Sequence, residues 1–378
     1  MKKELLVVLS TGFALFSMFF GSGNLVFPIQ VGLESEGHYV MASLGVLCTC
    51  VLFPLLGMLG MTLYKGNTDE FFACFGKKGV FLFSLLALSL MGPFGVLARC
   101  LTVMHGALVL VLPDLPLVAT SLFMCVALYF LTTNKNKIVT LLGAFLTPFL
   151  LAAIAVIVFF GLQHGMPPET VSSQYLPAFA NGFFTGYQTM DLVASFFFSG
   201  FVLQHLYRAN QDKEVQLKLF VKASFVGAAL LYAVYFALVL LGWLYAPELG
   251  ATAPQELFGK IAFSALGAFA APAVCLVVVL ACLTTAMALT SLFADFLRRD
   301  VCKEVIGSKL ALGLTLAVAF VVSNLAFSGI ANFLGPILET VYPALITLTV
   351  LNIVCKLCKL KASHWPFTAT VVAKLLWV

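Results

Sequence analysis

Long apolar runs follow one another along almost the whole chain, with only short polar connections between them. Read against the glycine, proline and charged residues that interrupt them, these runs predict ten helices. Most of the runs reach or exceed the roughly 20 residues that a helix needs to cross a bilayer. The pattern therefore predicts an all-α polytopic membrane protein with one transmembrane domain over residues 1–378. The predicted helices cover residues 6–33, 38–64, 79–112, 115–133, 137–162, 182–206, 216–246, 260–297, 308–328 and 331–354.

Composition supports the same class of protein. Hydrophobic residues make up 62% of the chain and charged residues 10%, against about 25% charged in soluble domains. The ten cysteines lie mostly inside apolar runs and are interpreted as small hydrophobic residues, so no cofactor is expected. The sequence contains no P-loop, H-E-x-x-H or G-x-S-x-G motif. We therefore expect neither an enzyme nor an ATP-driven pump.

Basic residues divide unequally between the two sides of the predicted membrane. With the N-terminus in the cytoplasm, most of the 21 Lys and Arg residues fall on cytoplasmic segments, which is the positive-inside pattern. The net charge of +5 thus indicates topology, and no nucleic-acid partner is needed to explain it. The expected partner of the surface is the lipid bilayer.

The ten helices divide into two groups of five, residues 6–162 and 182–354. Because each group has an odd number of helices, a structural repeat between them must be inverted across the membrane. The alternative is a bundle of ten helices without internal symmetry. The remaining apolar segment, residues 365–378, reaches only ~21 Å as a helix, so it forms either part of a span or an interfacial helix.

The first predicted helix contains a cluster of helix breakers, Gly21–Asn24 followed by Pro28. The cluster begins ~17 Å from the end of the run at Gly32, close to the middle of the bilayer. Backbone N–H groups freed by a break would bind an anion, and the freed carbonyls of Ser17 and Phe20 would bind a cation. The alternative reading is that these glycines only allow close helix packing.

The sixth predicted helix carries Asp191 at a similar depth, with a second candidate break at Ser199–Gly200. A carboxylate in the membrane is costly unless it is paired, so Asp191 is expected to bind a cation or an amine. A structural alternative is a salt bridge to Arg99 in the third helix. If Glu339 is a second buried acid and both acids are ionised, Arg99 balances only one of the two negative charges. A bound Na⁺, a proton or a substrate ammonium group would balance the other.

The eighth predicted helix places Ala281, Thr284 and Thr285 on one face, at positions i, i+3 and i+4. Two hydroxyls and a carbonyl are hard oxygen ligands and form a plausible cation site. Membrane threonines also hydrogen-bond to their own helix, which is the alternative for these two residues.

Three segments, FFGSGNLVFP, NGFFTGYQTMD and VVSNLAFSG followed by ETVYPALI, resemble the bacterial branched-chain amino acid:cation symporter family, the BrnQ-like transporters. The resemblance covers most of the chain. It implies a LeuT-type fold of five plus five inverted helices with discontinuous helices 1 and 6, in the bacterial cytoplasmic membrane. It also implies import of leucine, isoleucine and valine, with Na⁺ as the coupling ion.

The resemblance assigns roles to single residues. It implies that the N–H groups of Ser22 and Gly23 bind the substrate carboxylate, and that Asn24 serves a second cation. Asp191 would bind either that cation or the substrate amine. The Na⁺ ligands implied by the resemblance are Ser17, Phe20, Ala281, Thr284 and Thr285.

An aliphatic substrate side chain needs an apolar surface, which we expect at Phe197 and Phe198, next to Ser199, with the third helix near Phe94. The main competing hypothesis is a transporter of the same fold with another substrate or with proton coupling, in which Asp191 or Glu339 is protonated. A membrane-embedded enzyme would need a nucleophile and base or a metal triad, and a channel would need a polar stripe; neither pattern is seen.

Overall fold

The computed structural model describes residues 2–133, 147–168, 174–209, 212–250, 252–267, 270–360 and 365–376, and these ranges contain helices but no strand. The first half of the chain forms α1 Lys2–Phe19, α2 Ser22–Leu33, α3 Tyr39–Val46, α4 Phe53–Leu63, α5 Thr68–Phe71, α6 Gly76–Met91, α7 Val96–Val109, α8 Leu117–Thr132 and α10 Thr147–His164. The second half forms α11 Leu176–Thr185, α12 Asp191–Ala209, α13 Lys213–Leu244, α14 Ala246–Leu249, α15 Leu257–Leu266, α16 Ala270–Phe296, α17 Ser308–Ser323, α18 Ala326–Leu357 and α19 Trp365–Leu376.

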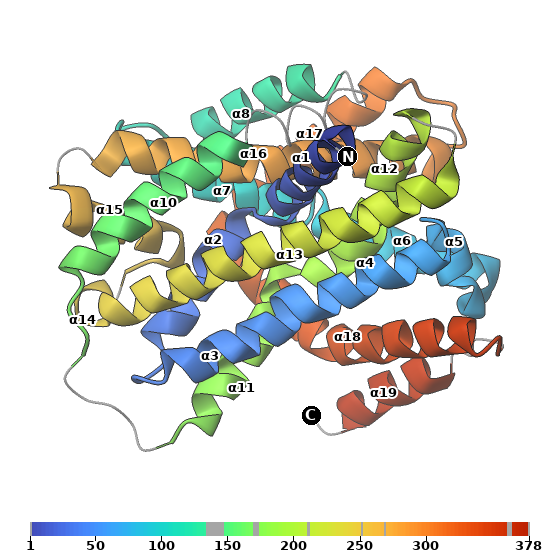
Figure 1. The fold of residues 1–378 in the computed structure, drawn as a ribbon. Helices are drawn as coiled ribbons and strands as arrows, with labels where there is room; N and C mark the ends of the chain where they lie inside the picture. Colours follow the sequence, from blue (N-terminus) through green and yellow to red (C-terminus); the bar gives the residue numbers. More distant parts are fainter. Residues whose placement is uncertain are drawn as a thin grey trace.

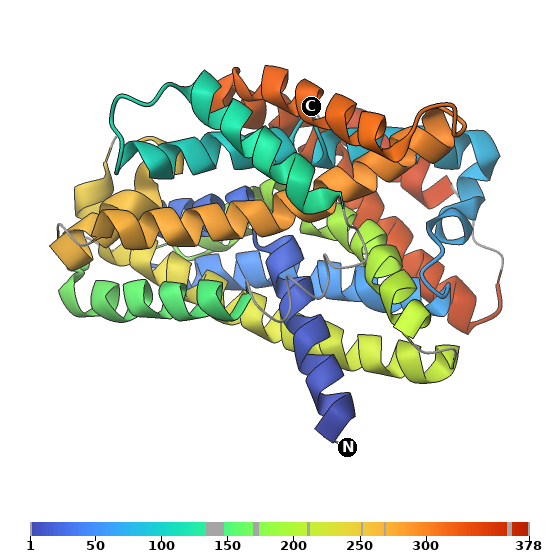
Figure 2. The ribbon, with the colours of Figure 1, turned by 90° about the horizontal axis from the view of Figure 1, so that it is seen from above.

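The described helices account for each of the ten predicted membrane segments. Six are long and apolar enough to cross a membrane, two more are bent pairs that qualify together, and two are shorter apolar helices. The long helices run side by side, whereas α1 leaves them at a steep angle (Figures 1 and 2). The prediction of an all-α polytopic membrane protein is confirmed.

Two of these segments are broken. The chain bends by 71° between α1 and α2, at the predicted glycine cluster, and by 41° between α11 and α12. The predicted position of the second break was wrong: Ser199 and Gly200 lie inside the continuous helix α12. The chain breaks instead at Met190, which follows the 3₁₀ turn η5 (Gly186–Thr189). The hydroxyl of Ser199 donates to the carbonyl of Ser195 at 2.5 Å, so this serine is accommodated within the helix.

Two predicted single helices are also divided. The segment 79–112 is interrupted by a turn between α6 and α7, where the sequence is Gly92-Pro93-Phe94-Gly95. The segment 260–297 is divided at Gly267, which has a φ of +62° that favours glycine. The start of the predicted helix 137–162 lies outside the described residues, and α10 begins at Thr147.

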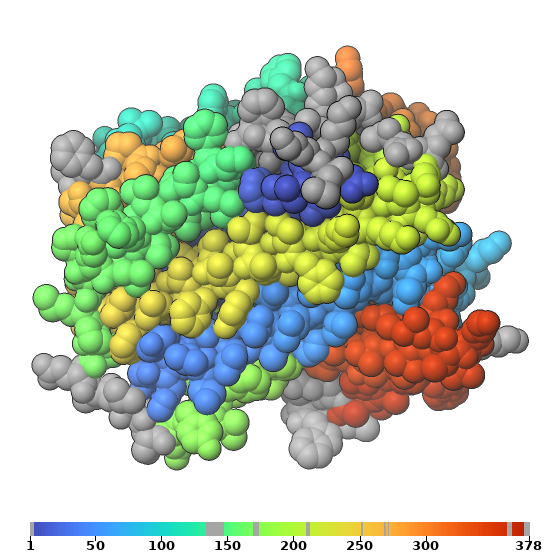
Figure 3. All heavy atoms as spheres, viewed as in Figure 1, coloured from blue at the N-terminus to red at the C-terminus, as the bar shows by residue number. Residues whose placement is uncertain are grey.

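The helix α13 crosses the face shown in Figure 3, in contact with α1, α2, α3, α4 and α10. Its closest approach is to α2. A Cβ atom added at Gly32 would lie 2.0 Å from the carbonyl oxygen of Val239, and one added at Gly242 would lie 2.1 Å from that of Ile29. The two backbones therefore touch directly, with no side chain between them.

The C-terminal apolar segment forms the short helix α19, which packs on α18 (Figure 1). The ring of Phe367 also lies edge-on to Phe75, with the ring centroids 5.0 Å apart. The segment therefore covers the bundle near the start of α6.

Candidate functional site

A buried cluster of three polar side chains joins both broken helices to α13. The side-chain amide of Asn24, in the first turn of α2, donates to Oδ1 and Oδ2 of Asp191 at 2.9 and 2.7 Å. The hydroxyl of Tyr235, on α13, donates to Asp191 Oδ2 at 3.1 Å and accepts a hydrogen bond from the Asn24 amide. These contacts use three of about four acceptor positions of a carboxylate, so Asp191 has room for a bound ammonium group or cation.

The second break is held by a side chain from α18. Met190 has a φ of +61°, in the left-handed region, and α12 starts at the next residue. The first-turn N–H of Leu192 donates to the hydroxyl of Tyr342 at 3.0 Å, which satisfies a donor that helix geometry leaves free. The ring of Tyr342 stacks on that of Tyr187 with the centroids 4.6 Å apart. Tyr342 of α18 therefore helps to fix where α12 begins.

The N-terminus of α2 is buried at the first break. Gly21 is extended, and no side chain caps the helix from that position. The backbone N–H groups at the start of a helix have no partner within the helix, so this end carries partial positive charge. Ser22 is fully buried, and its hydroxyl accepts a hydrogen bond from the thiol of Cys100 on α7. The break thus places donor groups in the protein interior.

The predicted cation ligands come together between α1 and α16. The hydroxyl of Thr284 donates to the carbonyl of Ser17 at 3.0 Å and to the carbonyl of Ala281 at 2.9 Å. The hydroxyl of Thr285 donates to the carbonyl of Ser17 at 3.1 Å. Thr284 therefore bonds both to its own helix, as the alternative for it predicted, and across to α1. The donor set consists of oxygen atoms only, the ligands that hard cations prefer.

Close packing keeps these oxygen atoms together. A Cβ atom added at Gly21 would lie 2.8 Å from the hydroxyl oxygen of Thr285. Phe20, the remaining predicted ligand, lies at the break with its ring stacked on Phe16 and Tyr235, at centroid distances of 5.1 and 6.2 Å. The first break, α16 and α13 are thereby packed into one core.

Arg99 does not form the salt bridge with Asp191 that the sequence suggested. Its Nη2 atom donates to the backbone carbonyl of Gln188 at 2.9 Å, and its guanidinium lies 5.5 Å from the centroid of the Phe27 ring. Gln188 belongs to η5, so its carbonyl is available next to the second break. The expectation that Glu339 is a second buried acid was wrong, because its side chain is exposed on α18.

The aromatic residues predicted to contact an aliphatic substrate lie on α12. Phe197 and Phe198 are buried, and Phe198 lies edge-on to Phe19 of α1 with the centroids 5.2 Å apart. Ser199 is buried beside them. Phe94 does not belong to this surface, because it lies in the turn between α6 and α7 and is 44% exposed.

Sequence reasoning missed three residues of this region. Tyr235 lies in a long apolar run that gives no signal for a polar role. Tyr342 and Gln188 lie inside the quoted segments ETVYPALI and NGFFTGYQTMD, so those segments pointed to them without assigning them roles. In each case the role of the polar group follows from a contact that is known only from the structure.

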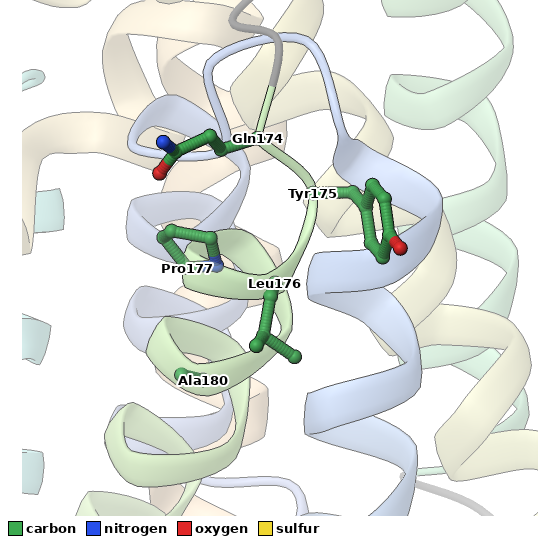
Figure 4. A pocket seen from close by; sticks show the side chains of 5 residues that line it. All are labelled: Gln174, Tyr175, Leu176, Pro177 and Ala180. Carbon is green, nitrogen blue, oxygen red and sulfur yellow. The ribbon is translucent and has the colours of Figure 1, made fainter.

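A separate recess of about 520 Å³ lies at the N-terminus of α11. Figure 4 shows the side chains of its lining, which come from one stretch of chain, residues 174–180. Tyr175 lies edge-on to His38 at a centroid distance of 6.5 Å. The recess is at the opposite end of α11 from Met190, so it does not belong to the polar cluster.

An all-helical membrane protein in which two discontinuous helices meet at buried polar residues has the architecture of a LeuT-type secondary transporter. Solved structures share the fold. The closed form of Mhp1, a nucleobase-cation-symport-1 family transporter with bromovinylhydantoin bound, matches with a TM-score of 0.67 at 15% identity over 91% of this chain and 77% of Mhp1. MhsT in complex with L-phenylalanine matches with a TM-score of 0.65 at 12% identity over 97% of each chain.

Sequence comparison defines the family within this fold. A family model described as branched-chain amino acid transport protein matches residues 3–377. The branched-chain amino acid permease BrnQ of Corynebacterium glutamicum is 31% identical, over 98% of this chain and 85% of the permease. The chain therefore belongs to the branched-chain amino acid transport protein family, and it is a multi-pass membrane transporter rather than an enzyme.

Proposed function

We propose that this protein is a Na⁺-coupled symporter that imports leucine, isoleucine and valine across the bacterial cytoplasmic membrane by alternating access, with its N-terminus in the cytoplasm. The observation that carries the coupling ion is the convergence of the Thr284 and Thr285 hydroxyls on the carbonyl of Ser17. A Na⁺ ion at this point would take up the oxygen atoms that now hydrogen-bond to one another. It would join α16 to the first broken helix.

The substrate would bind between the two breaks. In this proposal the N-terminus of α2 at Ser22 and Gly23 faces the substrate carboxylate, and Asp191 with Asn24 faces its amine or a second cation. Phe197, Phe198 and Ser199 of α12 would line the space for the aliphatic side chain. An apolar pocket distinguishes substrates that differ by one methylene by only about 1 to 3 kcal/mol, so all three branched-chain amino acids are expected substrates.

The relatives support the substrate class and the ion class separately. BrnQ is described as a branched-chain amino acid permease, and MhsT was solved with L-phenylalanine, an apolar amino acid. Mhp1 belongs to a family named for cation symport. In the outward-open state, cation binding would complete the contact between α1 and α16. Substrate binding would then permit the change to the inward-open state.

The test is uptake of radiolabelled leucine into proteoliposomes with and without an inward Na⁺ gradient. We expect leucine to accumulate when the Na⁺ gradient is present. In Thr284→Ala the Na⁺ concentration for half-maximal uptake should rise at least about tenfold, because one cation ligand is removed. The matched control is Thr290→Ala on the same helix, since the Thr290 hydroxyl is buried and has no hydrogen-bond partner among the residues described. Leucine uptake that is independent of Na⁺, or equal effects of the two substitutions, would refute the proposed coupling.

A proton-coupled transporter is the second candidate. It is favoured by the complete burial of Asp191 within a hydrogen-bonded network, whereas Glu339 is exposed and is a weaker choice for this role. Uptake driven by an inward proton gradient in Na⁺-free buffer would support this mechanism. Loss of that uptake in Asp191→Asn would assign the proton to the carboxylate.

A further inference from the structure

Arg99 is buried with most of its hydrogen-bonding capacity unused. The side chain is fully inaccessible to solvent, yet among the described residues only its Nη2 atom has a partner, the carbonyl of Gln188. Nε and Nη1 are buried and have no hydrogen-bond partner in the part of the chain that the structure describes. A guanidinium has five N–H donors in a fixed planar arrangement that matches a carboxylate. Buried guanidinium donors are stabilised when an acceptor pairs with them, so these two atoms are suited to an acceptor on a bound molecule.

The position of the guanidinium relates it to both breaks. It lies over the Phe27 ring, one helical turn after Gly23 in α2. The two groups that contact Arg99, the Phe27 ring and the Gln188 carbonyl, also lie next to Gly23. A Cβ atom placed on Gly23 would be 3.2 Å from the ring and 3.6 Å from the carbonyl oxygen. Arg99 and the N-terminus of α2 therefore present positive charge to the same region of the interior.

No acid among the described residues neutralises Arg99 directly. Asp191 lies beyond ion-pair distance and is occupied by Asn24 and Tyr235, and Glu339 points outward. The neighbouring residue Cys100 bonds to Ser22 instead. The interior thus holds a carboxylate, Asp191 at the start of α12, and a guanidinium, Arg99 on α7, that are not paired with each other.

We propose that Arg99 binds the carboxylate of a zwitterionic amino acid through its unpartnered guanidinium donors, while Asp191 faces the positive end of the same ligand. This inference rests on the proposed amino acid transport and assigns a substrate contact outside the first broken helix. It makes recognition depend on both ends of the zwitterion. It also explains how a guanidinium is tolerated in the interior: the ligand completes its hydrogen bonds.

The experiment compares leucine with leucinamide, which keeps the ammonium group and replaces the carboxylate by a neutral amide. Binding of each ligand to purified protein is measured for the natural protein and for Arg99→Gln. The natural protein should bind leucine at least about tenfold more tightly than leucinamide, the range of a charged hydrogen bond. In Arg99→Gln this ratio should fall to about threefold or less, because leucine binding weakens and leucinamide binding does not. Arg299→Gln serves as the control and should keep the natural ratio, because Arg299 is exposed in the π-helical turn η8 (Leu297–Val301) that follows α16.

The outcomes separate this inference from the proposed function. If the natural protein binds none of leucine, isoleucine and valine, the proposed function fails and the inference falls with it. If it binds them and Arg99→Gln keeps the natural ratio, the inference alone is overturned. Should Arg99→Gln fail to fold, Arg99→Lys tests the inference instead, because lysine keeps the positive charge and lacks the planar arrangement of N–H donors. It should weaken leucine at least about threefold and leave leucinamide unchanged, and equal weakening of both ligands would overturn the inference.

Discussion

The break between α1 and α2 is built from small residues, whereas the break between α11 and α12 is built from a methionine and a network of polar side chains. At the first break Gly21 is extended and lies against Thr285 so closely that a Cβ atom has no room. At the second, Met190 adopts a left-handed conformation that costs a residue with a side chain about 1 to 2 kcal/mol. The first break depends on the absence of a side chain at Gly21, and the second on packing that holds Met190 in a left-handed conformation.

The two solutions suit different neighbours. The first break has to let α16 approach the backbone, so that hydroxyls of α16 reach the carbonyl of Ser17. The second has to fix a carboxylate, and it is surrounded by Asn24, Tyr235 and Tyr342. Burial of the Met190 side chain, which is 1% exposed, offsets the strain of its backbone. Strained residues at functional sites persist when the surroundings over-determine them in this way.

The largest effect is expected from Asp191→Asn at the second break. The substitution keeps the shape and removes the charge, so a bound cation or amine loses its counter-charge in the interior. We expect leucine transport to fall by at least about 100-fold, because breaking a buried charge pair costs about 3 to 5 kcal/mol. Uptake in proteoliposomes measures the loss.

The matched control for Asp191→Asn is Glu339→Gln, which neutralises an exposed acid on α18. It should keep transport within about threefold of the natural protein, because this side chain faces away from the protein interior that holds the polar cluster. If Glu339→Gln is the more damaging of the two substitutions, the assignment of the working carboxylate to the second break is wrong.

A smaller effect is expected from Gly21→Ala at the first break. The added methyl group would push on Thr285 and widen the gap to Ser17, and overpacking of this kind costs about 1 to 3 kcal/mol. We expect about a tenfold weaker apparent affinity for Na⁺, read from the Na⁺ dependence of leucine uptake. The control is Gly313→Ala on α17, where an added Cβ atom meets nothing within 4 Å. An unchanged Na⁺ dependence in Gly21→Ala would show that this close approach does not hold the cation ligands.

The smallest effect concerns the backbone at Met190. Met190→Gly and Met190→Ala lose nearly the same buried side chain, but only glycine relieves the left-handed conformation. Met190→Gly should therefore be more stable than Met190→Ala by about 1 kcal/mol. At the buried Met287, inside α16, the order should reverse by a similar amount, because alanine is the better helix former. Thermal unfolding of the four purified variants measures both differences, and the same order at both positions would contradict the strain at Met190.

This contrast also explains which features the sequence could predict. The bilayer requires every spanning segment to be a long apolar helix, so the helices could be recognised from hydropathy. The first break could be predicted because glycine and proline mark it directly. The second could not be located, since Met190 is an ordinary helix residue and its conformation is imposed by Tyr342 and the surrounding packing. Ser199 and Gly200 gave a false signal because a helix accommodates both.

The candidate site was predictable where chemistry is unusual for its surroundings. Asp191 and Asn24 are conspicuous in a membrane segment, and the structure places them in contact. Thr284 and Thr285 were identified through helical spacing and resemblance. The hydroxyl of Tyr235 could not be assigned, because an aromatic residue in an apolar run gives no indication that its polar end is used. The partner of Arg99 also depended on a carbonyl freed by a break that the sequence did not locate.

The direct contact of the α2 and α13 backbones at Gly32 and Gly242 has a mechanical consequence. Side chains between helices can change rotamer when one helix shifts, and where they are missing two helices cannot slide or tilt past each other without a collision of their backbones. The two helices are then expected to move together as one rigid unit. A displacement of Asn24, in the first turn of α2, would therefore also move the end of α13 at Leu244, which lies nine residues or about 14 Å beyond its partner Tyr235 at about 1.5 Å per residue.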